Sequence, residues 1–268
     1  MSEKEKVENS DYPVTTKSLV NEFKKGGINK GDTIIVHSSL SSLGWVCGGA
    51  VALINALKRV ISKKGNLVMP THCGDYSEPK YWGNPAVPED WWKTIREEMP
   101  AYHPEITPTR DVGVVPETFR KYPATVRSDH PVNSFAAWGA DKEEIIKNHK
   151  INSSLGEKSP LQKIYNLDGK ILLIGVNHDS NTSLHLAEYM ANYNKNYKKQ
   201  GAPIIKNGKR TWVEYEDLEV NSDDFIDLGK EYESEYDFIK FKIGHTKAKL
   251  FSQVKLIDYA VEWFEKNR

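Results

Sequence analysis

The run Lys170-Ile171-Leu172-Leu173-Ile174-Gly175 constrains the fold more than any other stretch of this 268-residue chain. A short, continuous apolar run of this kind is typical of a strand that is buried on both faces of a sheet. Similar runs at 33–37 and 66–69 flank residues 50–61, whose apolar side chains recur at helical spacing. A strand, a helix and a second strand in this order predict a right-handed parallel unit.

The rest of the pattern adds helices and a hairpin to this sheet. Helices are expected near 89–98, 116–122, 142–148, 183–193 and 253–266, and another strand at 134–138. Asn207-Gly208, between 203–206 and 210–215, predicts a hairpin because both residues tolerate positive φ. Residues 1–15 are polar and are expected to be loose. We therefore expect one α/β domain over 1–268, a three-layer α/β/α arrangement around a mixed sheet with a C-terminal β-hairpin and helix.

An irregular segment interrupts the pattern at about 72–109. Six of the 13 prolines lie between Pro79 and Pro108, together with Trp82, Trp91 and Trp92. Proline blocks regular pairing whereas aromatic side chains favour burial, so we expect an ordered flap. The flap either covers a substrate or serves packing alone.

Composition narrows the class of protein. Lys plus Arg and Asp plus Glu are 37 each, and a net charge of zero does not favour binding of a nucleic-acid backbone. No apolar run approaches the roughly 18 residues of a membrane span, and no signal peptide pattern follows the charged amino end. Two cysteines, Cys47 and Cys73, cannot form a disulfide framework. We expect a cytoplasmic protein with reduced thiols and without membrane or nucleic-acid partners.

His185 and Glu188 are the strongest candidates for chemistry. They are three residues apart on a helix that is expected to begin after the buried strand and the loop 176–182, so their side chains share a face. A carboxylate there can accept a hydrogen bond from one imidazole nitrogen and leave the other free as a base. The alternative is a capped helix that carries a surface His–Glu pair.

Three further stretches have the composition of anion-binding turns. His37-Ser38-Ser39-Leu40 follows the first strand, Gly48-Gly49 opens the next helix, and Thr107-Pro108-Thr109-Arg110 offers two hydroxyls and a guanidinium. None matches a P-loop or a Gly-x-Gly-x-x-Gly pattern. Taken singly, each is also compatible with an ordinary turn.

Two rival chemistries and one charged segment stay open at this point. Cys73 could be a nucleophile activated by a histidine. A zinc site could draw on scattered ligands (His72, Cys73, His178, His185 and Glu188), although no recognised ligand spacing appears. Residues 214–237 carry 11 acidic residues and one lysine, which would attract a cationic substrate or form a solvated face.

Four stretches together resemble the aminoglycoside 3-N-acetyltransferases, an antibiotic acetyltransferase family. They occur in the family's order, and the similarity extends from about residue 15 to the end; the stretches are 37–44, 107–110, Arg127-Ser128-Asp129-His130-Pro131 and 179–188. Val112 stands where relatives often carry Met. The flap between His72 and His103 matches least well.

The resemblance implies an acyltransferase that moves an acetyl group from acetyl-coenzyme A to the 3-amino group of a 2-deoxystreptamine antibiotic, and hence a role in antibiotic resistance. It implies His185 as the catalytic histidine and Glu188 as its carboxylate partner. The stretches that line the coenzyme A site in relatives correspond here to Ser38, Ser39, Gly44, Trp45, Thr71, Thr107, Arg110 and Gly113. Asp75 and Asp179 are candidates for binding the cationic acceptor, and no metal is expected.

These residues suit direct transfer without an acyl-enzyme, in which His185 removes a proton from the attacking amine. Donors near Ser38 or Thr71 could stabilise the oxyanion. The alternatives are an acetyltransferase for a different small amine, an acyltransferase that depends on Cys73, and a coenzyme A binding protein without activity. The sequence does not decide between a monomer and a homodimer.

Overall fold

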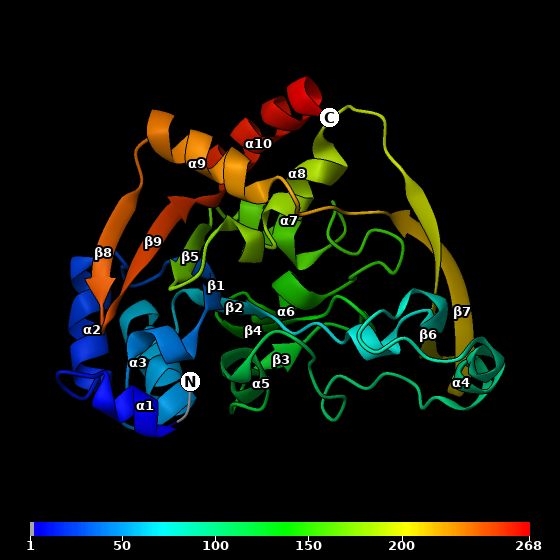
Figure 1. Ribbon diagram of the computed structural model, residues 1–268, viewed down its shortest axis with the longest axis horizontal. Coiled ribbons are helices and arrows are strands. Elements are labelled where there is room, and N and C mark those ends of the chain that lie inside the picture. Colours follow the sequence, from blue (N-terminus) through cyan, green and yellow to red (C-terminus); the bar gives the residue numbers. More distant parts are fainter. Residues whose placement is uncertain (1–2) are drawn as a thin grey trace.

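A seven-stranded mixed sheet forms the centre of the computed structural model, which describes residues 3–268. The strand order is β3-β4-β2-β1-β5-β9-β8 (Figure 1). The bounds are β1 Thr33–Ser38, β2 Asn66–Pro70, β3 Val126–Arg127, β4 Phe135–Gly139, β5 Lys170–Ile174, β8 Ile239–Ile243 and β9 Thr246–Ser252. β1 pairs in parallel with β2 and β5, and the other neighbours are antiparallel. The predicted parallel unit is therefore present.

Helices cover both faces of this sheet, because alternate residues of the central strands face opposite cores. Ile34 and Val36 belong to one core and Ile35 to the other. The first core also takes residues from α2 (Thr16–Lys25), α3 (Gly49–Ile61) and α5 (Val114–Arg120). The second takes residues from α6 (Lys142–Ile146), α7 (Pro160–Asn166), α8 (Leu184–Met190), α9 (Phe225–Glu235) and α10 (Gln253–Asn267). The predicted α/β class with a mixed central sheet is confirmed.

The predicted hairpin forms a separate two-stranded sheet that carries the flap. β6 (Tyr197–Lys206) and β7 (Lys209–Leu218) pair along their full length, and Asn207 and Gly208 have φ of 53° and 74°. The flap contains short 3-10 turns and α4 (Trp92–Glu98), which lies beside the hairpin in Figure 1. Tyr102 donates its backbone N–H to the carbonyl of Pro203 at 2.9 Å. The flap is thus an ordered excursion, as its aromatic content predicts.

The amino-terminal segment differs from expectation. α1 spans Glu3–Glu8, and the side chain of Val14 is fully buried beside Val46. The prediction of a loose segment is therefore wrong for these residues, because one apolar anchor fixes an otherwise polar stretch. No helix within residues 3–268 is both long and apolar enough to cross a membrane.

Candidate active site

A cavity of about 650 Å³ opens where β1 and β5 end, at the edge at which parallel sheets collect their sites. Its walls come from five parts of the chain: α1, the end of β1 with the turn after it, the end of β2 with the residues after it, the loop before α5 with the first residues of α5, and the segment between β5 and the start of α8. The lining residues are Lys6, 36–41, Pro70, His72, 111–116, Val176, Asp179, Ser180, Thr182 and His185.

His185 and Glu188 form a hydrogen-bonded pair beside this cavity. α8 begins at Leu184, which places His185 in the first turn as predicted. The Nδ1 of His185 contacts Oε2 of Glu188, and the imidazole packs on the ring of Phe225 with centroids 4.8 Å apart. Because Nδ1–H donates to the carboxylate, Nε2 is the nitrogen left to exchange a proton. The arrangement is that of an oriented general base.

Glu188 is fully buried behind His185, and other groups complete its hydrogen bonds. The backbone N–H of Asn221 donates to Oε1 at 2.9 Å, and the guanidinium of Arg268 contacts the same oxygen. Sequence reasoning missed both partners. They come from positions 33 and 80 residues away, so no local spacing could have indicated them.

Ser38, the last residue of β1, and Ser39, in the turn that follows, lie on the cavity wall. The Ser39 carbonyl accepts a hydrogen bond from Oγ of Ser42 at 2.7 Å, which tightens the 3-10 turn Leu40–Leu43. Gly175, with φ of 61°, ends β5 against this turn. A Cβ on Gly175 would lie 1.8 Å from Oγ of Ser42, so only glycine lets the two segments meet.

Two further predicted residues, Gly113 and Asp179, also line the cavity, together with one residue that the sequence did not suggest. Gly113 precedes α5 with φ of 82°, and Asp179 is exposed. Lys6 reaches the same cavity from α1. Sequence reasoning placed Lys6 in a loose, charged terminus, where nothing distinguished it from its neighbours.

Gly44 and Trp45 hold the amino-terminal segment rather than the cavity wall. The backbone N–H of Trp45 donates to Oγ of Ser10 at 2.8 Å, and its carbonyl accepts from Val14 at 2.9 Å. A Cβ on Gly44 would clash with His245 and with Ser10. Their effect on the cavity is indirect, through the placement of α1.

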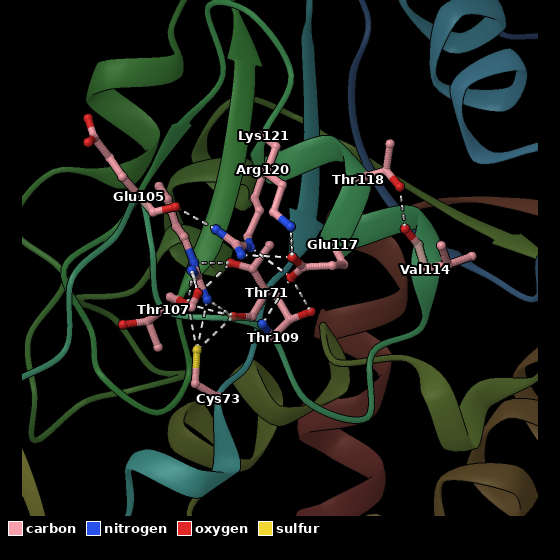
Figure 2. Close-up of polar contacts among 12 residues, drawn as sticks. Thr71, Cys73, Glu105, Thr107, Thr109, Val114, Glu117, Thr118, Arg120 and Lys121 are labelled. Atoms are coloured by element: carbon pink, nitrogen blue, oxygen red, sulfur yellow. Dashed lines mark hydrogen bonds and ion pairs between the residues drawn. The ribbon is translucent and has the colours of Figure 1, made fainter. Parts of the chain in front are cut away.

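The side chains of Thr71 and Cys73 and the backbone carbonyl of Thr107 belong to a buried network instead of the cavity (Figure 2). Arg127 lies at its centre: Nε donates to Oγ1 of Thr71 at 3.1 Å and Nη1 to the carbonyl of Thr107 at 2.6 Å. Oγ1 of Thr107 accepts from the backbone N–H of His103 at 2.9 Å. Both side chains are buried and hydrogen-bonded within the protein and do not line the cavity, and their role at a coenzyme site stays a prediction.

Cys73 is 1% exposed, and its sulfur lies 2.7 Å from Nη2 of Arg127. Burial raises the pKa of the thiol, although the neighbouring guanidinium opposes this shift. The structure does not bring Cys73 to the cavity. A buried thiol that cannot reach a substrate does not fit the nucleophile hypothesis.

Thr109 and Arg110 are also engaged within the protein. Glu117 accepts from the backbone N–H and the hydroxyl of Thr109 at 3.0 and 2.8 Å, as Figure 2 shows. Arg110 pairs with Asp75 and donates to the carbonyl of Asn84 at 2.7 Å. Arg110 and Asp75 line a second cavity of about 430 Å³ under the flap, and the first cavity shares Asp111 with it. The stretch 107–110 thus fastens the flap in this structure, and its role as a phosphate-binding segment stays a prediction.

Four histidines near the cavity are held neutral. Burial is the main cause that lowers the pKa of His37 and His72 to about 3 and of His149 to about 4, and it lowers that of His130 well below 6.5. The hydrogen bonds of His130 agree with this: Nδ1 accepts from two backbone N–H groups, those of Val132 and Asn133. A proton on that nitrogen would break both bonds.

These four histidines predict an acid-sensitive fold. In the unfolded chain each titrates near 6.5, so the unfolded state binds more protons below that pH. The free energy of unfolding should be fully present above pH 6.5 and fall as the pH drops toward 4. The slope is at most about 1.4 kcal/mol per pH unit for each histidine.

Denaturant unfolding at several pH values between 7.5 and 4.5 measures this slope. His149→Gln removes one of the four groups and should reduce the slope by about the share of one proton. A free energy of unfolding that stays flat from pH 7 to 5 would show that the histidines are not neutral in the folded protein.

Three residues of the acidic segment 214–237 are held in contacts within the fold, and the other eight acidic residues are exposed. Tyr189 donates to Asp217 at 2.8 Å, Asp224 accepts from Arg268 at 2.8 Å, and Glu233 contacts His178 at 3.0 Å. Within residues 3–268, no group of three His, Cys, Asp or Glu side chains could hold a metal ion.

Comparison with known proteins places this geometry in a family. The family model for aminoglycoside 3-N-acetyltransferase matches residues 35–265. The chain is 47% identical over 262 residues to the SPbeta prophage-derived aminoglycoside N(3')-acetyltransferase-like protein YokD of Bacillus subtilis (strain 168), and this covers 97% of the chain and 96% of YokD. The crystal structure of YokD, 46% identical, superposes with a TM-score of 0.97 over 98% of each chain.

More distant relatives agree. Aminoglycoside N(3)-acetyltransferase VII of Streptomyces paromomycinus is 31% identical over 284 residues, covering 99% of this chain and 96% of its own. The structure of AAC-IIIb with CoASH is 28% identical, with a TM-score of 0.86, and covers 95% of this chain and 97% of its own. The family, the fold class and the enzyme class predicted from the sequence are confirmed. The chain belongs to the aminoglycoside 3-N-acetyltransferase family.

Proposed function

We propose that the chain transfers the acetyl group of acetyl-coenzyme A directly to the 3-amino group of a 2-deoxystreptamine aminoglycoside, with His185 as general base. The observation that carries the proposal is the His185–Glu188 pair, which turns one imidazole nitrogen toward a buried carboxylate beside the large cavity. The family membership supports the reaction. The CoASH complex of AAC-IIIb supports the donor.

The chemistry follows from these groups. The amine nitrogen attacks the thioester carbonyl, a C–N bond forms, and the C–S bond breaks as the tetrahedral intermediate collapses. Nε2 of His185 takes the proton that the amine loses, and the Nδ1–H bond to Glu188 holds the ring in the tautomer that can accept it. The leaving thiol has a pKa near that of free cysteine, about 8.5, so the thiolate needs little assistance.

The cavity walls offer different partners to the two substrates. Coenzyme A carries phosphates, and the cavity wall offers the hydroxyls of Ser38 and Ser39 and the ammonium group of Lys6, which also pairs with Glu3. The acceptor carries ammonium groups, and Asp179 and Asp111 line the same cavity with exposed carboxylates. Arg110 pairs with Asp75 and, at 3.3 Å, with Asp111, so Asp179 is the strongest of the three candidates for the acceptor.

Incubation with acetyl-coenzyme A and a panel of aminoglycosides, followed by free thiol release, tests the proposal. Release that requires the antibiotic, with a product that is acetylated on the 3-amino group by NMR, is the expected result. Thiol release without any acetylated aminoglycoside would contradict it.

A second candidate is the same reaction on a different small amine. The specific observation in its favour is that YokD, at 47% identity, is named only as acetyltransferase-like. If no aminoglycoside of the panel causes thiol release, but coenzyme A clearly shifts the melting temperature, this candidate is favoured.

A further inference from the structure

Arg268 lies against the His185–Glu188 pair, although it is about eighty residues from Glu188 in sequence. It caps α10, and its guanidinium contacts Oε1 of Glu188. The same group donates to both carboxylate oxygens of Asp224, at 2.8 and 2.5 Å, and to the carbonyl of Asn221 at 2.8 Å. The ring of Phe264 stacks under it, 4.0 Å from the guanidinium carbon to the centroid. Five contacts therefore fix one side chain.

These contacts join the loop before α9 and the end of α10, which both donate to Glu188. The backbone N–H of Asn221 and the guanidinium of Arg268 both donate to Oε1, and the imidazole of His185 contacts Oε2. Arg268 also donates a hydrogen bond to the Asn221 carbonyl. Glu188, Asn221 and Arg268 are therefore linked in a closed ring of hydrogen bonds. Because these bonds fix Oε1, the carboxylate group cannot rotate, and Oε2 stays directed toward His185.

Charge gives the second part of the argument. Removing an ionised carboxylate from water is costly unless it is paired and hydrogen bonded. Glu188 is fully buried, and the side chain of Arg268 is itself only 14% exposed, so little water screens their attraction. The other titratable groups around the pair and His185 are Asp224 before α9, Tyr193 and Lys195 after α8, and the neutral rings of His37 and His72.

We infer that Arg268 is a positioning residue for the acetyl transfer: it keeps Glu188 ionised and oriented, and so keeps Nε2 of His185 available as the base. The inference rests on the proposed function of His185. Arg268 does not line the cavity, so it has no direct contact through which it could bind either substrate.

Arg268→Gln tests the inference in the full-length enzyme with the best acceptor of the panel. We expect kcat to fall about 10-fold to 100-fold, less than the roughly 10²–10⁴-fold that a general base supplies. The KM for acetyl-coenzyme A should stay within about twofold. The acid limb of the profile of kcat/KM against pH should move to higher pH by roughly one unit, because the Glu188–His185 pair then holds its proton more tightly.

Two further variants separate charge from packing. Arg268→Lys keeps the charge but cannot make the forked contacts, so kcat should be intermediate and the acid limb should stay where it is in the wild type. Asp224→Asn removes the ion pair between Asp224 and Arg268 and leaves the contact with Glu188, and it should lower the melting temperature with little change in the pH profile.

A wild-type kcat and pH profile in Arg268→Gln would overturn the inference, as would an Asp224→Asn variant that reproduces the full loss. If Arg268→Gln does not fold, Arg268→Lys decides, because a wild-type kcat there removes any role for the fork. His185→Ala serves as reference. Retained turnover in His185→Ala refutes the proposed base itself, whereas lost turnover beside an unaffected Arg268→Gln refutes only the role of Arg268.

Discussion

His185→Ala is expected to lose about 10²–10⁴-fold in kcat, because the attacking amine then has no positioned group to take its proton. The affinity for acetyl-coenzyme A should change little, since the imidazole occupies one point on a cavity wall made by five separate segments. Steady-state turnover and calorimetric titration with coenzyme A measure the two quantities separately.

His245→Ala is the matched control for this loss. His245 stacks on Tyr12 with ring centroids 4.6 Å apart and does not line the cavity beside His185. The control should keep turnover near that of the wild type. Turnover near that of the wild type in both variants would show that the reaction does not need His185. A large loss in both variants would show that the loss does not depend on which histidine is replaced.

Arg127→Met should destabilise the fold by about 3 kcal/mol or more, because several buried acceptors lose their donor at once. Arg127 is 7% exposed and donates to the carbonyls of Pro104, Thr107 and Thr71 at 3.1, 2.6 and 2.7 Å. It ties the flap to the ends of β2 and β3. Methionine fills much of the space but donates no hydrogen bond.

Denaturant unfolding of Arg127→Met measures this cost, with Arg59→Met as the control. Arg59 is exposed on α3, and its replacement should change the free energy of unfolding by no more than about 0.5 kcal/mol. A loss in Arg127→Met as small as in Arg59→Met would show that the buried network contributes little. We expect the flap to loosen first, because the lost bonds are those that hold it.

The central strands and the hairpin could be predicted because their signals are local. An apolar run such as 170–174 has few folds open to it, and Asn207-Gly208 specifies its own turn. α9 and the β8–β9 hairpin were missed. β8 is an edge strand with exposed Lys240 and Lys242, so its polar pattern does not indicate a strand.

The contact between His185 and Glu188 could also be predicted, since the two residues are one helical turn apart. Lys6, Asn221 and Arg268 could not, because the fold brings them to the site from distant parts of the chain. The contacts of Thr71 and Thr107 could not be predicted either. Their stretches match the family's motifs, but a motif does not indicate that a buried arginine occupies their oxygens.

The most direct test of the account is rapid-mix thiol release with acetyl-coenzyme A in the presence and absence of an accepted aminoglycoside. Direct transfer to a base-activated amine predicts release only when the acceptor is present, with no early burst. One equivalent of thiol released per enzyme before any acceptor is added would indicate an acyl-enzyme, and would contradict a reaction built on His185 and Glu188.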